Sequence, residues 1–287
     1  MKAFVRRVTL VVGLVALATG GVQATDIAGT IATTLTMTED SRLVGDVTCT
    51  VSGAACIQFS APSLTLQLSG HTITGQGSPD RCPSGVLFGE DGIHTKGQAG
   101  VSIGGPGLVR RFREHGILVN GDHSAVRQVV VASSCVAGIA VFGRDNRVEQ
   151  NTVVRAALVG PGFAGIFCGG DGGHRLRHNE VVRGGGPGIT VAPASGSSAR
   201  PNLLEENSAS GNDGIGLVLA LGAIGNTVRR NAVLGNRQSP DMLDGNPAGA
   251  NRYEANLCET SLGGVPSCPN LPALSGHEDP TVTDEGD

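Results

Sequence analysis

Residues 146–151 read NRVEQN, and similar six-residue segments return four more times along the chain. The later copies are HRLRHN at 174–179, NLLEEN at 202–207, NTVRRN at 226–231 and NRYEAN at 251–256, and a weaker copy, SAVRQV, occupies 124–129. A second series of Gly-Ile pairs interleaves with them and begins at Gly92, Gly116, Gly138, Gly165, Gly188 and Gly214. Two short strand signals in a fixed order within each repeat predict a solenoid of stacked coils.

Two positions within the six-residue segments explain how such coils would stack. The sixth residue is asparagine in five copies, and coils lie about 4.8 Å apart, so the amides would bond to one another in a column. The fourth residue alternates in charge between neighbouring coils, where each opposite pair contributes roughly 0.2–1 kcal/mol. The alternating residues are Arg127, Glu149, Arg177, Glu205, Arg229 and Glu254.

The whole pattern resembles the right-handed parallel β-helix repeat family of the pectate-lyase-like superfamily, and its two ends look like those of bacterial secreted members. The resemblance covers residues 64–268 and implies an all-β parallel β-helix of about seven to eight coils. We expect an N-terminal cap and first strands over 25–63 and a flexible acidic tail over 269–287. Members of the family are implicated in carbohydrate binding, polysaccharide cleavage and uronate epimerisation, so the function has to be argued from a site.

The first 24 residues have the features of a secretory signal. A positively charged start precedes an apolar run at 8–18, and the small-x-small sequence at 22–24 predicts cleavage after Ala24. The alternative is a membrane anchor, but the apolar run of about 11 residues is short against the roughly 20 that span a bilayer. We therefore expect a periplasmic or extracellular protein.

The seven cysteines agree with export to an oxidising compartment. Cys49 and Cys56 flank a short turn, and Cys258 and Cys268 flank a Gly/Pro-rich loop, so each pair is expected to form a disulfide. Because the total is odd, at least one thiol stays free; Cys168 falls at an inward position and is expected to act as a small buried apolar residue. The formal net charge of −4 implies no large basic surface, which argues against a nucleic-acid partner.

The candidate catalytic residues lie immediately before the first two Gly-Ile strands. Stacking of the coils would bring Asp91 beside His115, and a carboxylate that orients an imidazole is a common general-base arrangement. Arg113 and Lys96 could neutralise a uronate carboxylate next to the proton that His115 removes. The alternative is a solvated turn with ordinary surface ion pairs.

Further candidates line the outward side of the same strands and the turns that follow them. The expected substrate-binding residues are His94, Glu114, Asn120, Phe142 and Phe167, of which the two phenylalanines could stack on a sugar ring or form a local apolar patch. Asp122, Asp145 and Asp171 could form an acidic column that holds Ca²⁺ through oxygen ligands, although aspartate is also common in turns.

The sequence favours two functions of different classes. The first is polysaccharide binding or processing, with a uronate lyase as its most concrete form; the second is a non-catalytic surface or structural solenoid that binds a partner. The Arg-x-Pro-x-x-Arg segment of pectate lyases is absent, as are the Gly-His-Gly segment of polygalacturonases and the Asp-Pro-His-Asp segment of mannuronan epimerases. A third possibility, metal delivery to a copper enzyme, is disfavoured because the chain has only three Met and scattered His.

Overall fold

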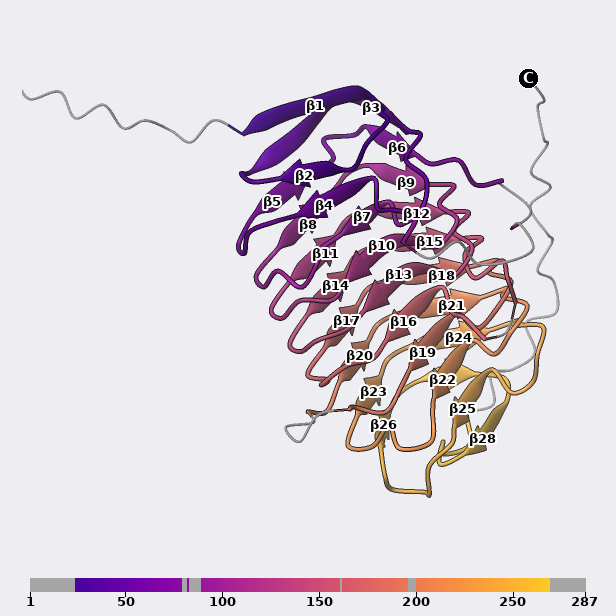
Figure 1. Ribbon diagram of the computed structural model, residues 1–287. Coiled ribbons are helices and arrows are strands. Elements are labelled where there is room, and N and C mark those ends of the chain that lie inside the picture. The colour runs from indigo at the N-terminus through magenta and orange to yellow at the C-terminus, as the bar shows by residue number, and fades with distance from the viewer. Residues whose placement is uncertain (1–23, 79–81, 83–88, 161, 196–199, 269–287) are drawn as a thin grey trace, which may run out of the picture.

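The computed structural model describes residues 24–78, 82, 89–160, 162–195 and 200–268, and Figure 1 shows them as one stack of parallel coils. The described residues contain 28 short strands and no helix, so the expected all-β parallel β-helix is confirmed. The strands form two sheets, one of 18 and one of ten strands.

The larger sheet has two columns of strands that meet at a corner. Its strands are β1 (Thr25–Ile31), β3 (Ser41–Cys49), β5 (Thr65–Gln67), β6 (Thr72–Thr74), β8 (Ser102–Gly104), β9 (Leu108–Arg110), β11 (Ala125–Arg127), β12 (Val130–Ala132), β14 (Arg147–Glu149), β15 (Thr152–Val154), β17 (Arg175–Arg177), β18 (Glu180–Val182), β20 (Leu203–Glu205), β21 (Ser208–Ser210), β23 (Thr227–Arg229), β24 (Ala232–Leu234), β26 (Arg252–Glu254) and β27 (Leu257–Cys258).

The ten-stranded sheet holds the Gly-Ile series. Its strands are β2 (Leu35–Met37), β4 (Ile57–Phe59), β7 (Ile93–His94), β10 (His115–Val119), β13 (Ala137–Val141), β16 (Ile166–Cys168), β19 (Ile189–Val191), β22 (Leu217–Leu219), β25 (Met242–Asp244) and β28 (Ser261–Gly263).

The core is a column of aliphatic side chains inside the coils. Ile93 pairs with Ile117, Ile117 with Ile139 and Ile139 with Ile166, and all four are fully buried. Because side chains alternate between the two faces of a strand, each buried isoleucine is followed by a residue on the outer face. The repeat therefore builds a dry core on one side of each sheet and a row of candidate binding positions on the other.

The structure corrects two details of the expected repeat. Ten strands in the smaller sheet exceed the expected seven to eight coils, because β2 and β4 precede residue 64, where the repeat signature is weak. Ile189 pairs with Leu217 and not with Ile215, so the sixth pair is Gly216-Leu217. The register follows the buried position, which Leu217 fills with 1% exposure, and not the identity of the dipeptide at Gly214.

Both predicted ladders are confirmed. In the larger sheet Arg127, Glu149, Arg177, Glu205, Arg229 and Glu254 pair in this order from coil to coil. The asparagine column is buried, and each amide from Asn151 to Asn231 donates to the side-chain oxygen of the next, at 2.9–3.0 Å. These contacts lock the register of successive coils, because a slip by one coil would place like charges together.

The two expected disulfides, Cys49–Cys56 and Cys258–Cys268, are present, and a third joins Cys82 to Cys135. Cys168 is the free cysteine among the described residues and is fully buried, as expected, and burial raises the pKa of its thiol. Residues 1–23 of the signal segment expected over 1–24, and the expected tail at 269–287, lie outside the described residues. The described part of the chain contains no helix with the length and apolar character that crossing a membrane would require.

Candidate functional site

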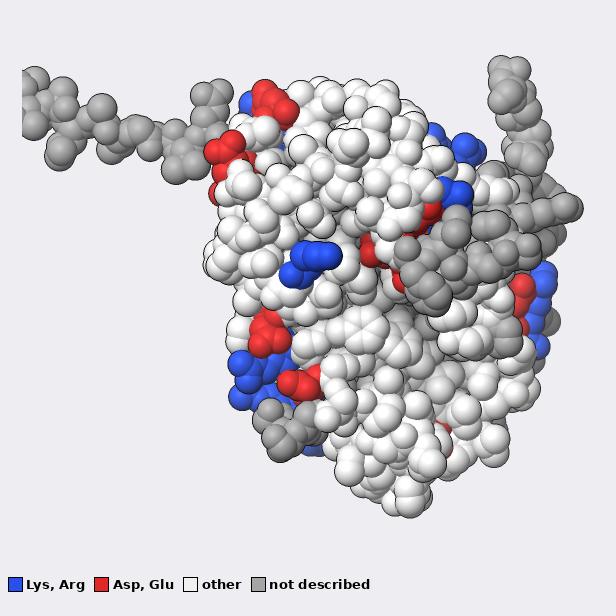
Figure 2. Space-filling view, viewed as in Figure 1, with Lys and Arg blue, Asp and Glu red and all other residues white. Residues whose placement is uncertain are grey.

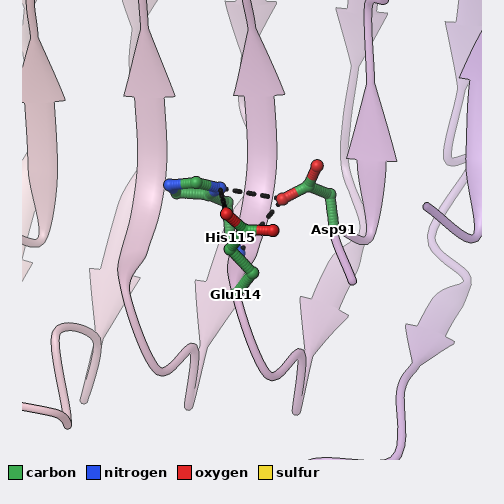
Figure 3. A group of neighbouring side chains, drawn as sticks. All are labelled: Asp91, Glu114 and His115. Carbon is green, nitrogen blue, oxygen red and sulfur yellow. Dashed lines mark hydrogen bonds and ion pairs between the residues drawn. The ribbon is translucent and has the colours of Figure 1, made fainter. Parts of the chain in front are cut away.

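The site is built where β7 and β10 begin on adjacent coils. Asp91 lies two residues before Ile93, and His115 is the first residue of β10. Stacking of the coils brings their side chains together, with 2.8 Å between His115 Nδ1 and Asp91 Oδ1 (Figure 3). The backbone N–H of His115 also donates to Asp91 Oδ1, at 3.3 Å. One aspartate oxygen therefore contacts both the ring and the backbone of His115, and the two residues lie together as stacking of the repeats predicts.

The hydrogen bond to Asp91 assigns the two ring nitrogens different roles. A carboxylate accepts, so Nδ1 carries a proton and donates it, and the neutral ring keeps Nε2 as the atom that can take a proton. Figure 3 shows this second nitrogen on the far side of the ring, pointing away from Asp91. The residue paired with His115 on the next coil is Ala137, a small side chain. About 12% of the His115 side chain is exposed.

His94 and Glu114 complete the cluster. His94 Nδ1 lies 3.3 Å from Asp91 Oδ2, and Glu114 Oε1 lies 3.8 Å from His115 Nδ1. Burial raises the pKa of Asp91, but hydrogen bonds from His115 and His94 and their charges outweigh burial and leave it below the usual value. Burial and the charge of Asp91 raise the pKa of Glu114. Two neighbouring carboxyl groups are thus pushed in opposite directions, Asp91 towards the charged form and Glu114 towards the protonated form.

Of the two side chains expected to neutralise a substrate carboxylate, Arg113 is paired with a glutamate and Lys96 is exposed. Arg113 lies beside Glu90, with Nη2 donating to Oε1 at 2.9 Å and Nε in contact with Oε2. Glu90 is 4% exposed and also accepts from Ser52 Oγ and from the backbone N–H of Gly53. Lys96 is exposed in the turn after β7, and no ion pair joins it to another described residue.

The same cluster has the donor atoms of a metal site. One ligand atom each from Asp91, Glu114 and His115 lie within 4.8 Å of one another. Asp91 Oδ2 is buried and has His94 Nδ1 as its neighbour at 3.3 Å, and two close carboxylates favour a cation between them. An imidazole with carboxylates suits zinc or manganese better than calcium, which prefers oxygen ligands alone. This cluster could therefore hold a divalent transition metal.

The remaining substrate-binding candidates do not join this cluster. Asn120 uses its side-chain oxygen to accept from Thr95 Oγ1 and from the backbone N–H of Gly97, so it holds the turn after β7 in place. Phe142 and Phe167 lie one coil apart, with ring centroids 5.6 Å apart and planes tilted by 43°.

Phe167 also lines an open groove of about 240 Å³ on the outer side of the ten-stranded sheet. The other lining residues are Gly162, Phe163, Pro187, Thr190, Ile215, Val218, Gln238 and Leu243. Figure 2 shows that this side of the molecule carries few charged side chains between its edges. An apolar groove with aromatic rings could accept the faces of sugar rings.

The three aspartates of the expected calcium column are placed differently from one another. Asp122 faces Arg144, at 2.9 Å from Oδ2 to Nε, and Asp145 faces Arg200, at 2.8 Å from Oδ2 to Nη1. Asp171 is half-buried in the equivalent turn. Two of the three carboxylates thus already have a cationic partner, which a calcium ion would have to displace.

The residues that support the cluster, and a second column of amides, were not among the residues expected from the sequence. Glu90 and Ser52 come from different coils, and no spacing along the chain connects them. In contrast, the second column could have been found in the sequence, because the first residue of the six-residue segments also repeats. It is asparagine at 146, 202, 226 and 251 and histidine at 174. These residues form a second buried ladder, and His174 takes the place of an asparagine in it.

The comparisons agree with this architecture. The sequence model of the family described as right handed beta helix region matches residues 115–256, and the chain belongs to the right-handed parallel β-helix family. No curated protein sequence matches the chain.

Solved structures with the same architecture differ widely in sequence. The A-module of the mannuronan C-5 epimerase AlgE6 of Azotobacter vinelandii is 17% identical, with a TM-score of 0.56, over 82% of this chain and 66% of that one. XylC in complex with xylose is 12% identical, with a TM-score of 0.49, over 70% of this chain and 38% of that one. Pectate lyase Pel9A is 10% identical, with a TM-score of 0.45, over 76% and 70%. At these identities the similarity concerns the fold.

Proposed function

We propose that this chain is an exported β-helix protein that binds and cleaves an acidic polysaccharide by β-elimination. The observation that carries the proposal is the Asp91–His115 pair, which lies where strands β7 and β10 of the ten-stranded sheet begin. Its Oδ1 and Nδ1 atoms are 2.8 Å apart. The apolar groove on the outer side of this sheet offers a surface for sugar rings. The three disulfides suit an oxidising compartment, in line with the signal segment expected over 1–24.

The residues of the cluster divide the reaction among them. His115 Nε2 takes the proton next to the uronate carboxylate, while Asp91 stabilises the imidazolium that results. The electron pair of the broken C–H bond forms the C=C bond, and the glycosidic C–O bond breaks. Glu114, whose raised pKa favours the protonated form, supplies the proton to the departing oxygen. Lys96 neutralises the substrate carboxylate, and Arg113 holds Glu90 in place.

The test is a lyase assay of the purified protein on pectate, alginate and glycosaminoglycans, with and without Ca²⁺. We expect ultraviolet absorbance of the unsaturated product to rise with one of these polymers. His115→Ala should lower the rate by at least about a hundredfold, the scale of general-base catalysis. The matched control is His178→Ala, since His178 is 47% exposed and lies on another coil, paired with Glu206. Full activity of His115→Ala would remove the base assignment.

Calcium dependence separates two proposals for cation binding. If the acidic column binds Ca²⁺, Asp122→Asn, Asp145→Asn and Asp171→Asn should abolish any gain in rate that Ca²⁺ gives. If the cation lies in the cluster of Asp91, Glu114 and His115, the gain should come from zinc or manganese and vanish with Glu114→Gln.

A second function is a non-catalytic solenoid that binds a glycan or protein partner. Two observations favour it: Arg113 is already engaged by Glu90, and little of the His115 side chain is exposed. A flat absorbance across the polymer panel, together with binding on a glycan array, would select this function over the lyase.

A further inference from the structure

Two arginines lie side by side on the larger sheet, and no acidic residue pairs with either of them across the strands. Arg147 of β14 and Arg175 of β17 pair directly between adjacent coils. The residues that flank them in the same row are Ala125 on one side and Leu203 on the other. Both arginines are exposed, and no ion pair joins either to another residue in the described part of the chain. Like charges at this position destabilise the sheet.

The row two residues further along the same strands behaves in the opposite way. There Arg127 faces Glu149 at 3.2 Å, and Arg177 faces Glu205 at 2.8 Å, so each positive charge has a negative neighbour. The pair of Arg147 and Arg175 therefore stands out against the neighbouring row, whose charges are balanced coil by coil. A free anion would balance it in the same way that the glutamates balance the neighbouring row.

The two guanidinium groups line an open groove of about 480 Å³. The other lining residues are His123, Ala125, Arg127, Asp145 and Gly173. The one carboxylate among them, Asp145, is held by Arg200 at 2.8 Å and lies 3.8 Å from His123. Figure 2 shows Lys and Arg atoms gathered at the left edge of the view, with Asp and Glu atoms beside them.

We propose that this groove is a second binding site for an acidic polysaccharide, which places carboxylate or sulfate groups on Arg147 and Arg175. The two arginines lie on successive coils, and neighbouring coils are about 4.8 Å apart. Their guanidinium groups can therefore bind anionic groups that repeat along an extended polymer chain. Nucleic acid fits less well, because single strands use aromatic platforms for base stacking and the groove is lined by no Phe, Tyr or Trp.

The site lies on the larger sheet, away from the Asp91–His115 cluster at β7 and β10. This second site depends on the proposed function only for the class of ligand, an acidic polysaccharide. The role of the site is to retain the polymer and not to cleave it. The two functions can therefore fail independently.

The experiment measures binding of alginate oligosaccharides and heparin oligosaccharides at physiological salt. We expect Arg147→Glu to weaken binding about tenfold or more, since it removes a charge-assisted hydrogen bond to the ligand and adds a charge that repels it. The same substitution places a glutamate beside Arg175 and extends the alternating pattern, so the melting temperature should stay the same or rise. Loss of binding would then not reflect unfolding.

Arg252→Glu is the matched control. Arg252 lies in the same row, reached from Arg175 through Leu203 and Thr227, and is 76% exposed, but Glu254 already neutralises it. It should change affinity less than about twofold.

The site is supported if the wild type binds either oligosaccharide and if Arg147→Glu removes this binding while Arg252→Glu does not. Preference for the alginate oligosaccharide indicates a carboxylate ligand, and preference for the heparin oligosaccharide indicates a sulfate ligand. Equal affinity of the wild type and Arg147→Glu would overturn it, as would no binding to either ligand. A DNA duplex is tested in the same way. If it binds more tightly than either oligosaccharide, and if Arg147→Glu removes that binding, the groove is a nucleic-acid site.

Discussion

At the scale of single residues, His174 shows how one substitution in a ladder adds pH dependence. It is fully buried; Nε2 lies 2.7 Å from the carbonyl oxygen of Gly169, and Nδ1 accepts from the backbone N–H of Asn146. Both contacts are satisfied only by the neutral ring with its proton on Nε2. Burial lowers the pKa of His174 in the folded protein.

Below a pH of about 6.5 the unfolded chain takes up a proton at this residue and the folded chain does not. The free energy of unfolding should therefore fall as the pH falls from about 6.5 towards the lowered folded pKa. His174→Asn restores the residue found elsewhere in the ladder, and we expect it to remove this part of the pH dependence. Melting temperatures at pH 7 and pH 5 measure the effect.

The control is His178→Asn, because His178 is 47% exposed and pairs with Glu206 at the surface. We expect its stability to fall between pH 7 and pH 5 as steeply as that of the wild type, or almost so. If His174→Asn kept the wild-type slope, His174 would not be the residue that titrates.

At the scale of the strands, the asparagine ladder fixes the corner between the two strand columns of the larger sheet. The side chain of Asn207 accepts from the backbone N–H and the amide of Asn179, and its own amide donates to Leu176 O and to Asn231. Asn207→Ala leaves these buried groups unpaired, at a cost of about 1–3 kcal/mol for each group. We expect a loss of at least about 2 kcal/mol in chemical denaturation.

Asn256 ends the same column, so it provides a graded comparison. It accepts from Asn231 and donates to Val228 O, and no further coil of the column follows it among the described residues. Water can replace part of what its side chain provides, so Asn256→Ala should cost less than Asn207→Ala. If both substitutions lowered the free energy of unfolding equally, the size of the lost side chain, and not its hydrogen bonds in the ladder, would account for the destabilisation.

The strands were predictable because their signals repeat. Each six-residue segment places an inward apolar residue, a charge and an asparagine at fixed positions, with Tyr253 in place of an aliphatic residue in the last copy, and five copies average out local ambiguity. The first two coils carry no such segment, so the number of coils was underestimated. The dipeptide at Gly214 gave the wrong register, although Leu217 follows residue 202 by 15 residues, as Ile189 follows residue 174.

At the scale of the whole molecule, the candidate site was predictable only in part. Asp91 and His115 occupy equivalent places in successive repeats, so stacking alone brings them together. Glu90 and Ser52 come together across 38 residues without any repeat relation, and the Arg113 contact with Glu90 depends on side-chain conformations that no spacing encodes. Side chains on irregular turns are placed by packing, which the sequence pattern does not record.

The third disulfide links coils that are not neighbours in the stack and should therefore affect stability more than the others. It closes a separation of 53 residues between Cys82 and Cys135, whereas Cys49 and Cys56 are 7 residues apart. In the chain-entropy description, the longer loop contributes about 4 kcal/mol and the shorter about 2.4 kcal/mol. We expect the double substitution of Cys82 and Cys135 by Ser to lower stability more than the same change at Cys49 and Cys56.

Hydrogen exchange adds a spatial test, because coils of a solenoid contact only their neighbours. The Cys82–Cys135 link brackets β7 and β10, which carry the catalytic candidates, so exchange should accelerate there and in β13. Strands β22 and β25, several coils away, should exchange as in the intact protein. A uniform acceleration across all strands would mean that the molecule unfolds as one cooperative unit, and that the disulfide stabilises the whole stack instead of the coils around the site.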